Sequence, residues 1–361
     1  MDSAFGAIDY LQGATTNDYR QHWDDVDLRY TLEVYDKADK YNADAEPVKD
    51  RQVVIVDKYA PVVFDLRLVP NREYHFVVFA DFVPQGVTTD SHEHNATAQA
   101  DLGLRHYIGA TLEHITVKND ALNDEVADAY FATADISIDS SKNHKIVLTR
   151  PYAKLRVIAT DLAELNINDD PAKLVVKYEA KHANKFNALT GEISGEYETN
   201  EYTVTYNGGV SKLDLSNHTY TAGWDAEKAT SAAGVERHTH MTLMADYILA
   251  ENEQDPIHFE IFAYDKVGGL IKHTNFDTDI PVQRNYLTTV IGNVLTTATH
   301  IEVSIDDNFA GEKVFGLWDG ESTIMPEYDA ENKTYIVRDG AQLAWVAASV
   351  NGTLKTRAAA N

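Results

Sequence analysis

The chain has 361 residues, which is enough for two ordinary domains at about 100–200 residues each. Its 57 acidic residues against 31 basic ones give a formal net charge of −26, which repels nucleic-acid phosphates and anionic lipid surfaces. It contains no cysteine, so disulfides, thiolate metal sites and a cysteine nucleophile are excluded.

The amino terminus reads Met1-Asp2-Ser3-Ala4 and has no apolar signal core. No run of about 18 apolar residues occurs, so no membrane-spanning helix is expected. If the protein is exported, we expect its signal to have been removed upstream of this numbering.

The first half of the chain is predicted to be a series of strands. Leu28–Tyr35 alternates apolar residues with Arg29, Thr31 and Glu33, which predicts a half-buried strand. Val62–Leu68 repeats the alternation, with Asp65 and Arg67 on the polar side. Pro70-Asn71 is then expected to turn the chain, as a hairpin, into the apolar central strand Tyr74–Phe82. Further strands are predicted in the ranges Thr111–Val117, Ala134–Ile138 and Ile146–Thr149.

Pro151 interrupts this series, and proline is best placed at the start of a strand or at a domain boundary. We place the boundary near Arg150, giving domains 1–150 and 151–315. The loop-like stretches Asp90–Gln99 and Asp225–His240 are candidates for short helices. The second series of predicted strands is Tyr152–Thr160, Leu174–Tyr178, Tyr202–Tyr206, Met241–Leu249, Ile257–Asp265, Asn285–Leu295 and Ile301–Ile305, with a turn at Gly268-Gly269. The predicted fold class is therefore all-β, with two tandem antiparallel sandwiches.

Residues 316–361 form a different unit, predicted as a short strand and a helix. Tyr335–Val337 has the character of a strand, and Leu343, Val346 and Val350 follow at helical spacing. Asp339 with Gln342 is suited to cap this helix, and Gly352 to end it. The segment is either a small peripheral cap or the start of a truncated module.

Several strings in both halves resemble the Bacteroidetes fimbrillin-like (Mfa-like or FimA-like) surface proteins. The resemblance extends over roughly residues 25–310 and rests on the order of the strings. They are Leu28–Tyr35, Phe64–Leu68, the aromatic strand Tyr74–Phe82 ending in Ala80-Asp81, Leu148–Leu155, and Ile280–Val290 with its Arg284-Asn285 pair.

This resemblance implies two transthyretin-like sandwiches, export as a lipoprotein to the outer membrane, and assembly with other pilus subunits by β-strand exchange. In such exchange a donated strand satisfies the unpaired backbone of an acceptor. It also implies that a blocking amino-terminal strand is cut after an arginine, for which Arg20 and Arg29 are the candidates. The chain departs from the pattern in lacking the lipoprotein cysteine and an obvious donor strand in its Trp318–Asn351 segment, so tip, anchor and shaft positions all stay open.

Three short clusters have metal-ligand residue types, but each is interpreted as a solvated loop. They are His92-Glu93-His94, His238-Thr239-His240 and Asp306-Asp307-Asn308. Neither histidine cluster has a third ligand at a suitable spacing, and the acidic one lacks the Asp-x-Asp-x-Asp-Gly loop of calcium sites. No catalytic, cofactor-binding or metal-binding residue is predicted.

The sequence also lacks the nucleophile elbow, phosphate loop, dinucleotide fingerprint and zinc-protease motif. With 57 acidic residues, the presence of a carboxylate pair carries no information about glycoside hydrolysis. The resemblance, together with the absence of these motifs, predicts a non-enzymatic structural or adhesive surface protein. The alternative is a glycan-binding surface lipoprotein, with Trp224 and Trp318 as the first candidates for exposed binding aromatics.

Overall fold

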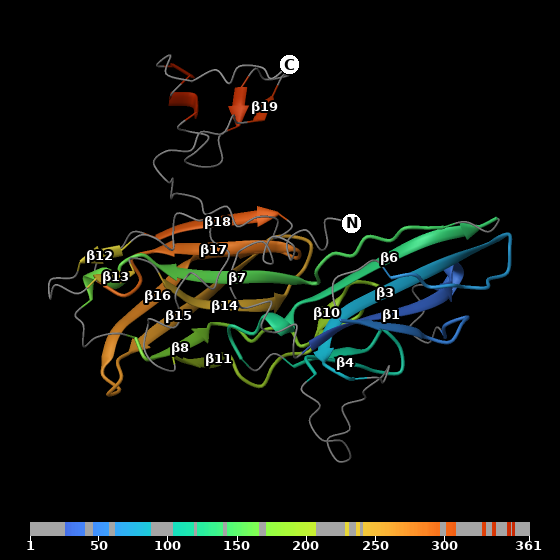
Figure 1. Ribbon diagram of the computed structural model, residues 1–361, viewed down its shortest axis with the longest axis horizontal. Coiled ribbons are helices and arrows are strands. Elements are labelled where there is room, and N and C mark those ends of the chain that lie inside the picture. Colours follow the sequence, from blue (N-terminus) through green and yellow to red (C-terminus); the bar gives the residue numbers. More distant parts are fainter. Residues whose placement is uncertain are drawn as a thin grey trace.

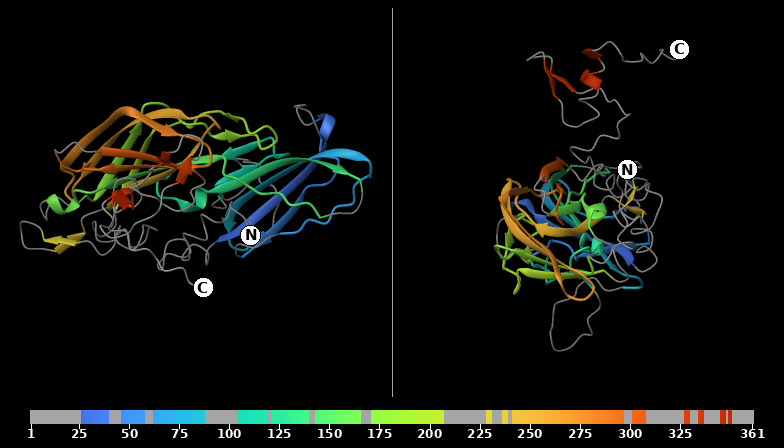
Figure 2. Two further views of the ribbon diagram at one scale, coloured as in Figure 1. Left: turned by 90° about the horizontal axis from the view of Figure 1, so that it is seen from above. Right: turned by 90° about the vertical axis from the view of Figure 1, so that its left-hand side faces the viewer.

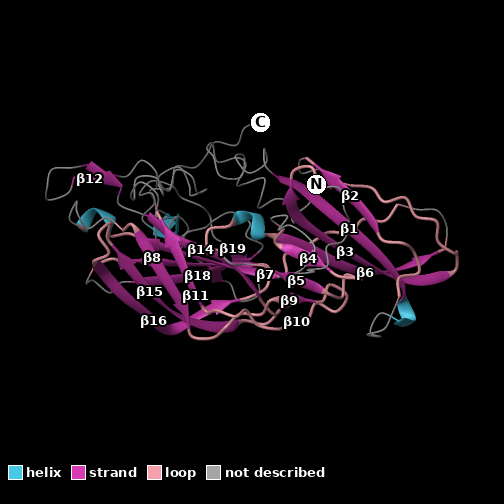
Figure 3. Cartoon of the chain, turned by 90° about the horizontal axis from the view of Figure 1, so that it is seen from below, coloured by secondary structure: helices cyan, strands magenta, loops and turns pink. Residues whose placement is uncertain are grey.

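The structure, a computed structural model, is almost entirely β, as predicted (Figure 3). Among the residues that it describes, no helix is long and apolar enough to cross a membrane. The described residues are 26–39, 46–57, 62–87, 104–118, 121–139, 143–165, 171–206, 228–230, 236–238, 241–296, 301–307, 327–329, 334–336, 345–347 and 349–350.

The first sheet, sheet A, has the strand order β2-β1-β3-β6 and lies at one end of the elongated molecule (Figure 1). All three pairings are antiparallel, and β3 lies between β1 and β6. The strands are β1 (Val26–Asp36), β2 (Gln52–Val56), β3 (Arg72–Pro84) and β6 (Ala129–Ile138). The predicted strand Val62–Leu68 does not pair with β3, so the expected hairpin is wrong; the Pro70-Asn71 turn is present, with Asn71 at φ 58°.

Strand β1 is buried on both faces, whereas the sequence predicted a half-buried strand. Arg29 and Thr31 are 0% exposed and Glu33 is 1% exposed. Their face of sheet A packs toward a second sheet, and the two charges are kept there by partners: Arg29 by Asp81 and Glu33 by Arg51. These ion pairs join residues far apart in the sequence and compensate the buried charges, so this polar face of β1 can lie in the interior.

This second sheet, sheet B, has the order β10-β9-β5-β4 and takes strands from both halves of the chain. Its strands are β4 (His106–Ile108), β5 (Ile115–Val117), β9 (Lys185–Phe186) and β10 (Ile193–Ser194). Val77 and Phe79 of sheet A share a core with Ile115 and Phe186 of sheet B. Residues after the predicted boundary near Arg150 thus complete the first sandwich, and the boundary itself stays a prediction.

The second sandwich consists of sheet C, with order β14-β7-β17-β18, and sheet D, with order β11-β8-β15-β16. Leu155 and Val157 of sheet C and Phe259 and Ile261 of sheet D lie in its shared core. The strands are β7 (Tyr152–Ala159), β8 (Lys173–Tyr178), β11 (Glu201–Thr205), β14 (Met241–Leu249), β15 (Asp255–Tyr264), β16 (Leu270–Val282), β17 (Tyr286–Gly292) and β18 (Ile301–Asp307).

The two sandwiches lie end to end and interlock through exchanged residues (Figure 1). Leu122, from the first half, packs in the core of the second sandwich, and Asn123 exchanges two hydrogen bonds with Ala245 of β14. In return Arg284, from the second half, donates to the Gly191 carbonyl at 2.5 Å and lies 5.6 Å from the ring centre of Phe131. The junction is therefore packed from both sides.

The remaining described elements are small. The helices expected in Asp225–His240 are absent from its described part, which instead holds the hairpin of β12 (Lys228–Thr230) and β13 (Glu236–His238). Asp90–Gln99 lies outside the described residues. β19 (Glu327–Asp329) pairs with β20 (Thr334–Ile336), and residues 345–347 and 349–350 are helical, as predicted for the last segment. β19, β20 and these helical residues lie apart from both sandwiches, as Figure 1 and the right-hand view of Figure 2 show.

His182 gives the stability of the fold a defined pH dependence. Burial lowers the pKa of His182 from 6.5 to about 4. As the pH falls through this window the unfolded chain takes up the proton first, so the folded state loses up to about 3 kcal/mol. We expect His182→Gln to remove this loss. Urea unfolding at a series of pH values measures it; equal losses in the native chain and the variant would contradict the assignment.

Candidate functional site

One face of sheet A carries an apolar cluster that no complete sheet covers among the described residues. Leu28 and Leu32 of β1 and Phe76 and Phe82 of β3 belong to it, all buried. Two extended segments from elsewhere in the chain pack against this cluster with partly buried side chains. We call residues 62–68 the first strap and residues 143–148 the second strap.

The first strap has the side-chain alternation of a strand but not its hydrogen bonds. Val62, Phe64, Leu66 and Leu68 are half-buried against the cluster, and the residues between them are exposed, with Val63 79% exposed. Among the described residues, no backbone hydrogen bond joins the first strap to another segment. Within the part of the chain that the structure describes, side chains alone therefore hold the first strap, and its N–H and C=O groups are available to another partner.

The second strap is tied to sheet A at one point. Thr149, the residue that follows it, exchanges backbone hydrogen bonds of 2.7 and 2.9 Å with Phe131 of β6. From this bridge no described ladder continues into residues 143–148, although Ile146 and Leu148 pack on the cluster. Val147, between them, is 40% exposed. The second strap thus leaves the edge of β6 and crosses onto the face of the sheet.

The two straps run in opposite directions across this face. The first strap leads into the start of β3 at Arg72, which pairs with Ile138 at the end of β6. The second strap sets out from that same end, after Ile138, and runs back to β7 (Figure 1). Together the straps form an incomplete opposing layer, which we call the accepting layer. In the first strap, the backbone has no partner among the described residues and lies over the apolar cluster, and a strand can be added to such a backbone.

The strands that carry the apolar cluster are held together by contacts on the opposite face of sheet A. Arg29 binds Asp81 through two hydrogen bonds of 2.9 and 2.7 Å, and all atoms of both side chains are buried. Burial opposes ionisation of Asp81, but the Arg29 guanidinium and the His106 contact outweigh it and hold the pKa of Asp81 below its ordinary value. The pair therefore fixes β1 against β3 directly beneath the apolar cluster.

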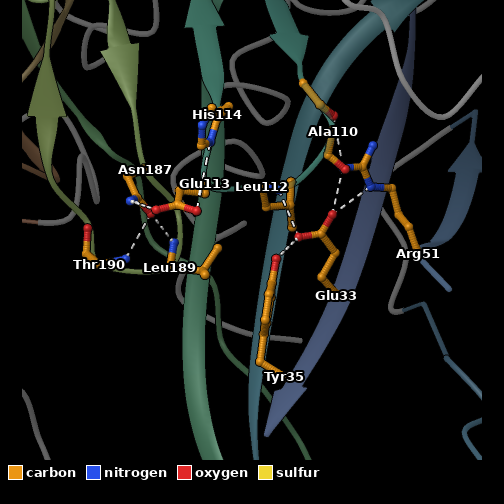
Figure 4. A network of polar contacts seen from close by, with 11 residues as sticks. Glu33, Tyr35, Arg51, Ala110, Leu112, Glu113, His114, Asn187, Leu189 and Thr190 are labelled. Atoms are coloured by element: carbon orange, nitrogen blue, oxygen red, sulfur yellow. Dashed lines mark hydrogen bonds and ion pairs between the residues drawn. The ribbon is translucent and has the colours of Figure 1, made fainter. Parts of the chain in front are cut away.

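A second polar network fixes the edge strand β2, as Figure 4 shows. Arg51, which precedes β2, donates to Glu33 at 2.8 Å and to the Ala110 carbonyl at 2.7 Å. Glu33 also accepts from the Leu112 amide at 2.8 Å and from the Tyr35 hydroxyl at 2.5 Å. Burial, together with the charge of Glu33, raises the pKa of Tyr35 far above its ordinary value. β2 is thus anchored to sheet B, unlike the straps.

The residues singled out in the sequence are not brought together by the described structure. No group of three metal-ligating side chains occurs among the described residues. His238 ends β13, and Asp306 and Asp307 end β18, without described side chains. The positions outside the described residues are Arg20, His92, Glu93, His94, Trp224, Thr239, His240, Asn308 and Trp318.

Arg29 is not an exposed cleavage site in the folded chain, because it lies inside β1 with a fully buried side chain. The glycan alternative gains no support from the outer face of sheet D. There the Phe262 ring stacks on His273 at 4.2 Å, and the Lys173 ammonium lies 4.4 Å from the Tyr264 ring centre. These ring faces are therefore engaged by neighbouring side chains.

The sequence profile of a family of unknown function, DUF6562, matches residues 7–338. The chain belongs to this family. No curated protein matches it.

Solved structures with a similar course of the chain come from Bacteroides and Porphyromonas. A "putative adhesin" from Bacteroides thetaiotaomicron is 12% identical with a TM-score of 0.42, over 78% of this chain and 89% of that one. A "putative cell adhesion protein" from Bacteroides uniformis is 10% identical with a TM-score of 0.40, over 77% and 91%. The tip fimbrial protein Mfa3 from Porphyromonas gingivalis, truncated at its carboxyl terminus, is 9% identical with a TM-score of 0.36, over 77% and 92%.

The first strap has no backbone partner among the described residues, which predicts fast amide exchange. Amides of residues 63–68 are expected to exchange at least about a thousandfold faster than those in the middle of β1 and β3, which exchange only after an opening that costs several kcal/mol. Hydrogen–deuterium exchange with peptide-level mass spectrometry measures both in one experiment. Equal protection of the first strap and β3 would show that the strap is paired.

The same geometry predicts where trypsin cuts. Proteases need an extended, unpaired substrate segment with an accessible side chain, and Arg67 meets these conditions while Arg29 does not. Of these two arginines, we expect native-state digestion to cut after Arg67 only, and Arg67→Gln to abolish that fragment. Mass spectrometry of short digests tests this. A fragment ending at Arg29 from a chain still intact at Arg67 would contradict it.

Proposed function

We propose that this chain is a cell-surface structural or adhesive protein of the fimbrillin-like type that works through β-strand addition at its accepting layer. The observation that carries the proposal is the pair of straps, which pack apolar side chains on sheet A yet have no strand ladder of their own among the described residues. The ordered strings of the sequence support the same assignment, and the names of the similar solved structures agree with it. Surface localisation, lipid anchoring and pilus partners follow from the same resemblance.

A strand added to this layer would gain backbone hydrogen bonds and apolar burial, the two contributions that stabilise a sheet. Its backbone would pair with N–H and C=O groups of the first strap, which have no partner among the described residues, at about 0.5–1.5 kcal/mol for each hydrogen bond. Its apolar side chains would cover half-buried residues such as Phe64 and Ile146. The proposal does not choose between tip, anchor and shaft positions.

The test is self-association of the full chain with a backbone readout. We expect oligomers in sedimentation velocity as the concentration is raised to the solubility limit, and in them slower amide exchange of the straps. Asp65→Pro, which removes one exposed N–H from the first strap, should weaken association at least about tenfold, the effect of about 1.4 kcal/mol. Asp65→Asn keeps the N–H and serves as the matched control.

Both variants should unfold at the denaturant concentration of the native chain, because the Asp65 amide makes no hydrogen bond with the described residues. A chain that stays monomeric at every concentration, or oligomers whose straps exchange as fast as in the monomer, would refute strand addition at this layer.

A further inference from the structure

Strand β2 is the outermost strand on one side of sheet A, as Figure 3 shows. Its inner edge pairs with β1, and among the described residues no backbone hydrogen bond reaches its outer edge. In such a strand the N–H and C=O groups of alternate residues point away from the sheet. The Arg51 contacts to Glu33 and Ala110 hold β2 in place. β2 therefore presents a fixed row of open backbone groups.

The composition of β2 does not protect this edge. Its sequence is Gln-Val-Val-Ile-Val, and all five residues are half-buried. Of the edge strands that the structure describes in sheets A, C and D, β2 alone contains no charged residue, whereas β6, β11, β14, β16 and β18 each contain at least one. An apolar edge without charge or proline pairs readily with another strand.

The sequence of β2 is suited to pair with itself in the antiparallel direction. When the pair is centred on Val54, this residue lies opposite Val54 of a second copy. Val53 then lies opposite Ile55, so two β-branched residues face each other. Gln52 lies opposite Val56. Because the pair is centred on a residue, the outward N–H and C=O groups of the two copies are in phase.

The charged residues next to β2 fit the same register. Arg51 of each copy lies opposite Asp57 of the other, which gives an opposite-charge pair at both ends. Asp57 is exposed. Among the described residues only Nε and Nη2 of Arg51 have acceptors, so its Nη1 can donate to a carboxylate of the second copy (Figure 4). Charge complementarity therefore selects a second copy of this chain as the partner.

We propose that β2 is a self-association surface: two copies pair their β2 strands about a two-fold axis at Val54 and join their A sheets into one continuous sheet. The same residues meet from both sides, as in other two-fold interfaces. This contact goes beyond the proposed function, because it involves neither strap and gives both copies the same role.

Cysteine cross-linking tests the register, because the chain has no cysteine of its own. In the proposed pair two Val54→Cys side chains lie directly opposite, within the Cα separation of about 4.4–6.8 Å that a disulfide needs. Two Gln52→Cys side chains, or two Val56→Cys side chains, are about 14 Å apart along the strands and cannot bond. Full-length variants are oxidised at about 0.15 M salt, where charges more than about 8 Å apart are screened. Non-reducing electrophoresis measures the linked dimer.

We expect Val54→Cys to give at least about tenfold more linked dimer than Gln52→Cys or Val56→Cys alone, since only opposed thiols are within reach. A mixture of the last two variants should also give linked dimer, because it places their thiols opposite each other. Unfolding curves show which variants are folded. If Val54→Cys does not fold, this mixture tests the same register.

The charge pairs are tested in the same assay. Asp57→Arg, added to Val54→Cys, makes both cross-strand pairs like-charged and should lower the amount of linked dimer about tenfold. Glu253→Arg is the matched control, because it changes the net charge equally at an exposed residue between β14 and β15. It should leave cross-linking unchanged. Equal effects of the two substitutions would overturn the proposed register.

The outcomes also separate this contact from strand addition. Linked dimer in no folded variant, or in equal amounts in all three single variants, would overturn the β2 contact. Oligomers whose straps become protected would then still support the proposed function. Dimers linked through Val54→Cys whose straps exchange as fast as in the monomer would support the β2 contact and speak against strand addition at the straps.

Discussion

Sheet A has apolar residues on one face and paired charges on the other, and both faces have to be covered. On the charged face, sheet B covers Arg29 and Asp81, whose two hydrogen bonds keep a buried charge from standing alone. Removing either partner of such a pair typically costs 3–5 kcal/mol. On the apolar face the cover consists of the straps and Val126 rather than a complete sheet, among the described residues. Because the contacts on the charged face hold the strands together, the apolar face can remain only partly covered.

The two sandwiches are built as one body, because each contributes residues to the interior of the other. β9 and β10 complete sheet B, while Leu122 enters the second core. Arg284 closes the junction, with Phe131 and Phe186 under its guanidinium. Gly191, at φ 79°, suits this contact, since a Cβ there would lie 3.0 Å from the Arg284 side chain. A strand added to the first sandwich would therefore be connected to the second sandwich through this packed junction.

Much of this fold could be read from the sequence, and the failures have physical causes. β14 was predicted with its observed bounds, and β1, β7, β8 and β15 to within two residues, since apolar runs and alternation report burial directly. β16 was missed because polar residues such as His273 and Asn275 interrupt an edge strand. The two-residue strands of sheet B are too short to leave a pattern.

The candidate site was only half predictable. The alternation in Val62–Leu68 correctly gave the inward and outward residues, but periodicity reports faces and not hydrogen-bond partners, so the strap was taken for a paired strand. One signal was present: Pro61 and Pro70 bracket the segment, and proline avoids the interior of a sheet. The burial of Arg29 could not be foreseen, because its partner Asp81 lies 52 residues away.

Strand addition creates a hazard as well as a function, since an open strand edge pairs with any suitable segment. The first strap reduces that hazard, because its inward side chains already cover part of the apolar cluster. The outward Asp65 and Arg67 place charges on the same segment, a known means of blunting an edge. The net charge of −26 adds repulsion between copies at longer range. Specificity at this layer would then come from the fit of alternate side chains, with the backbone hydrogen bonds supplying the affinity.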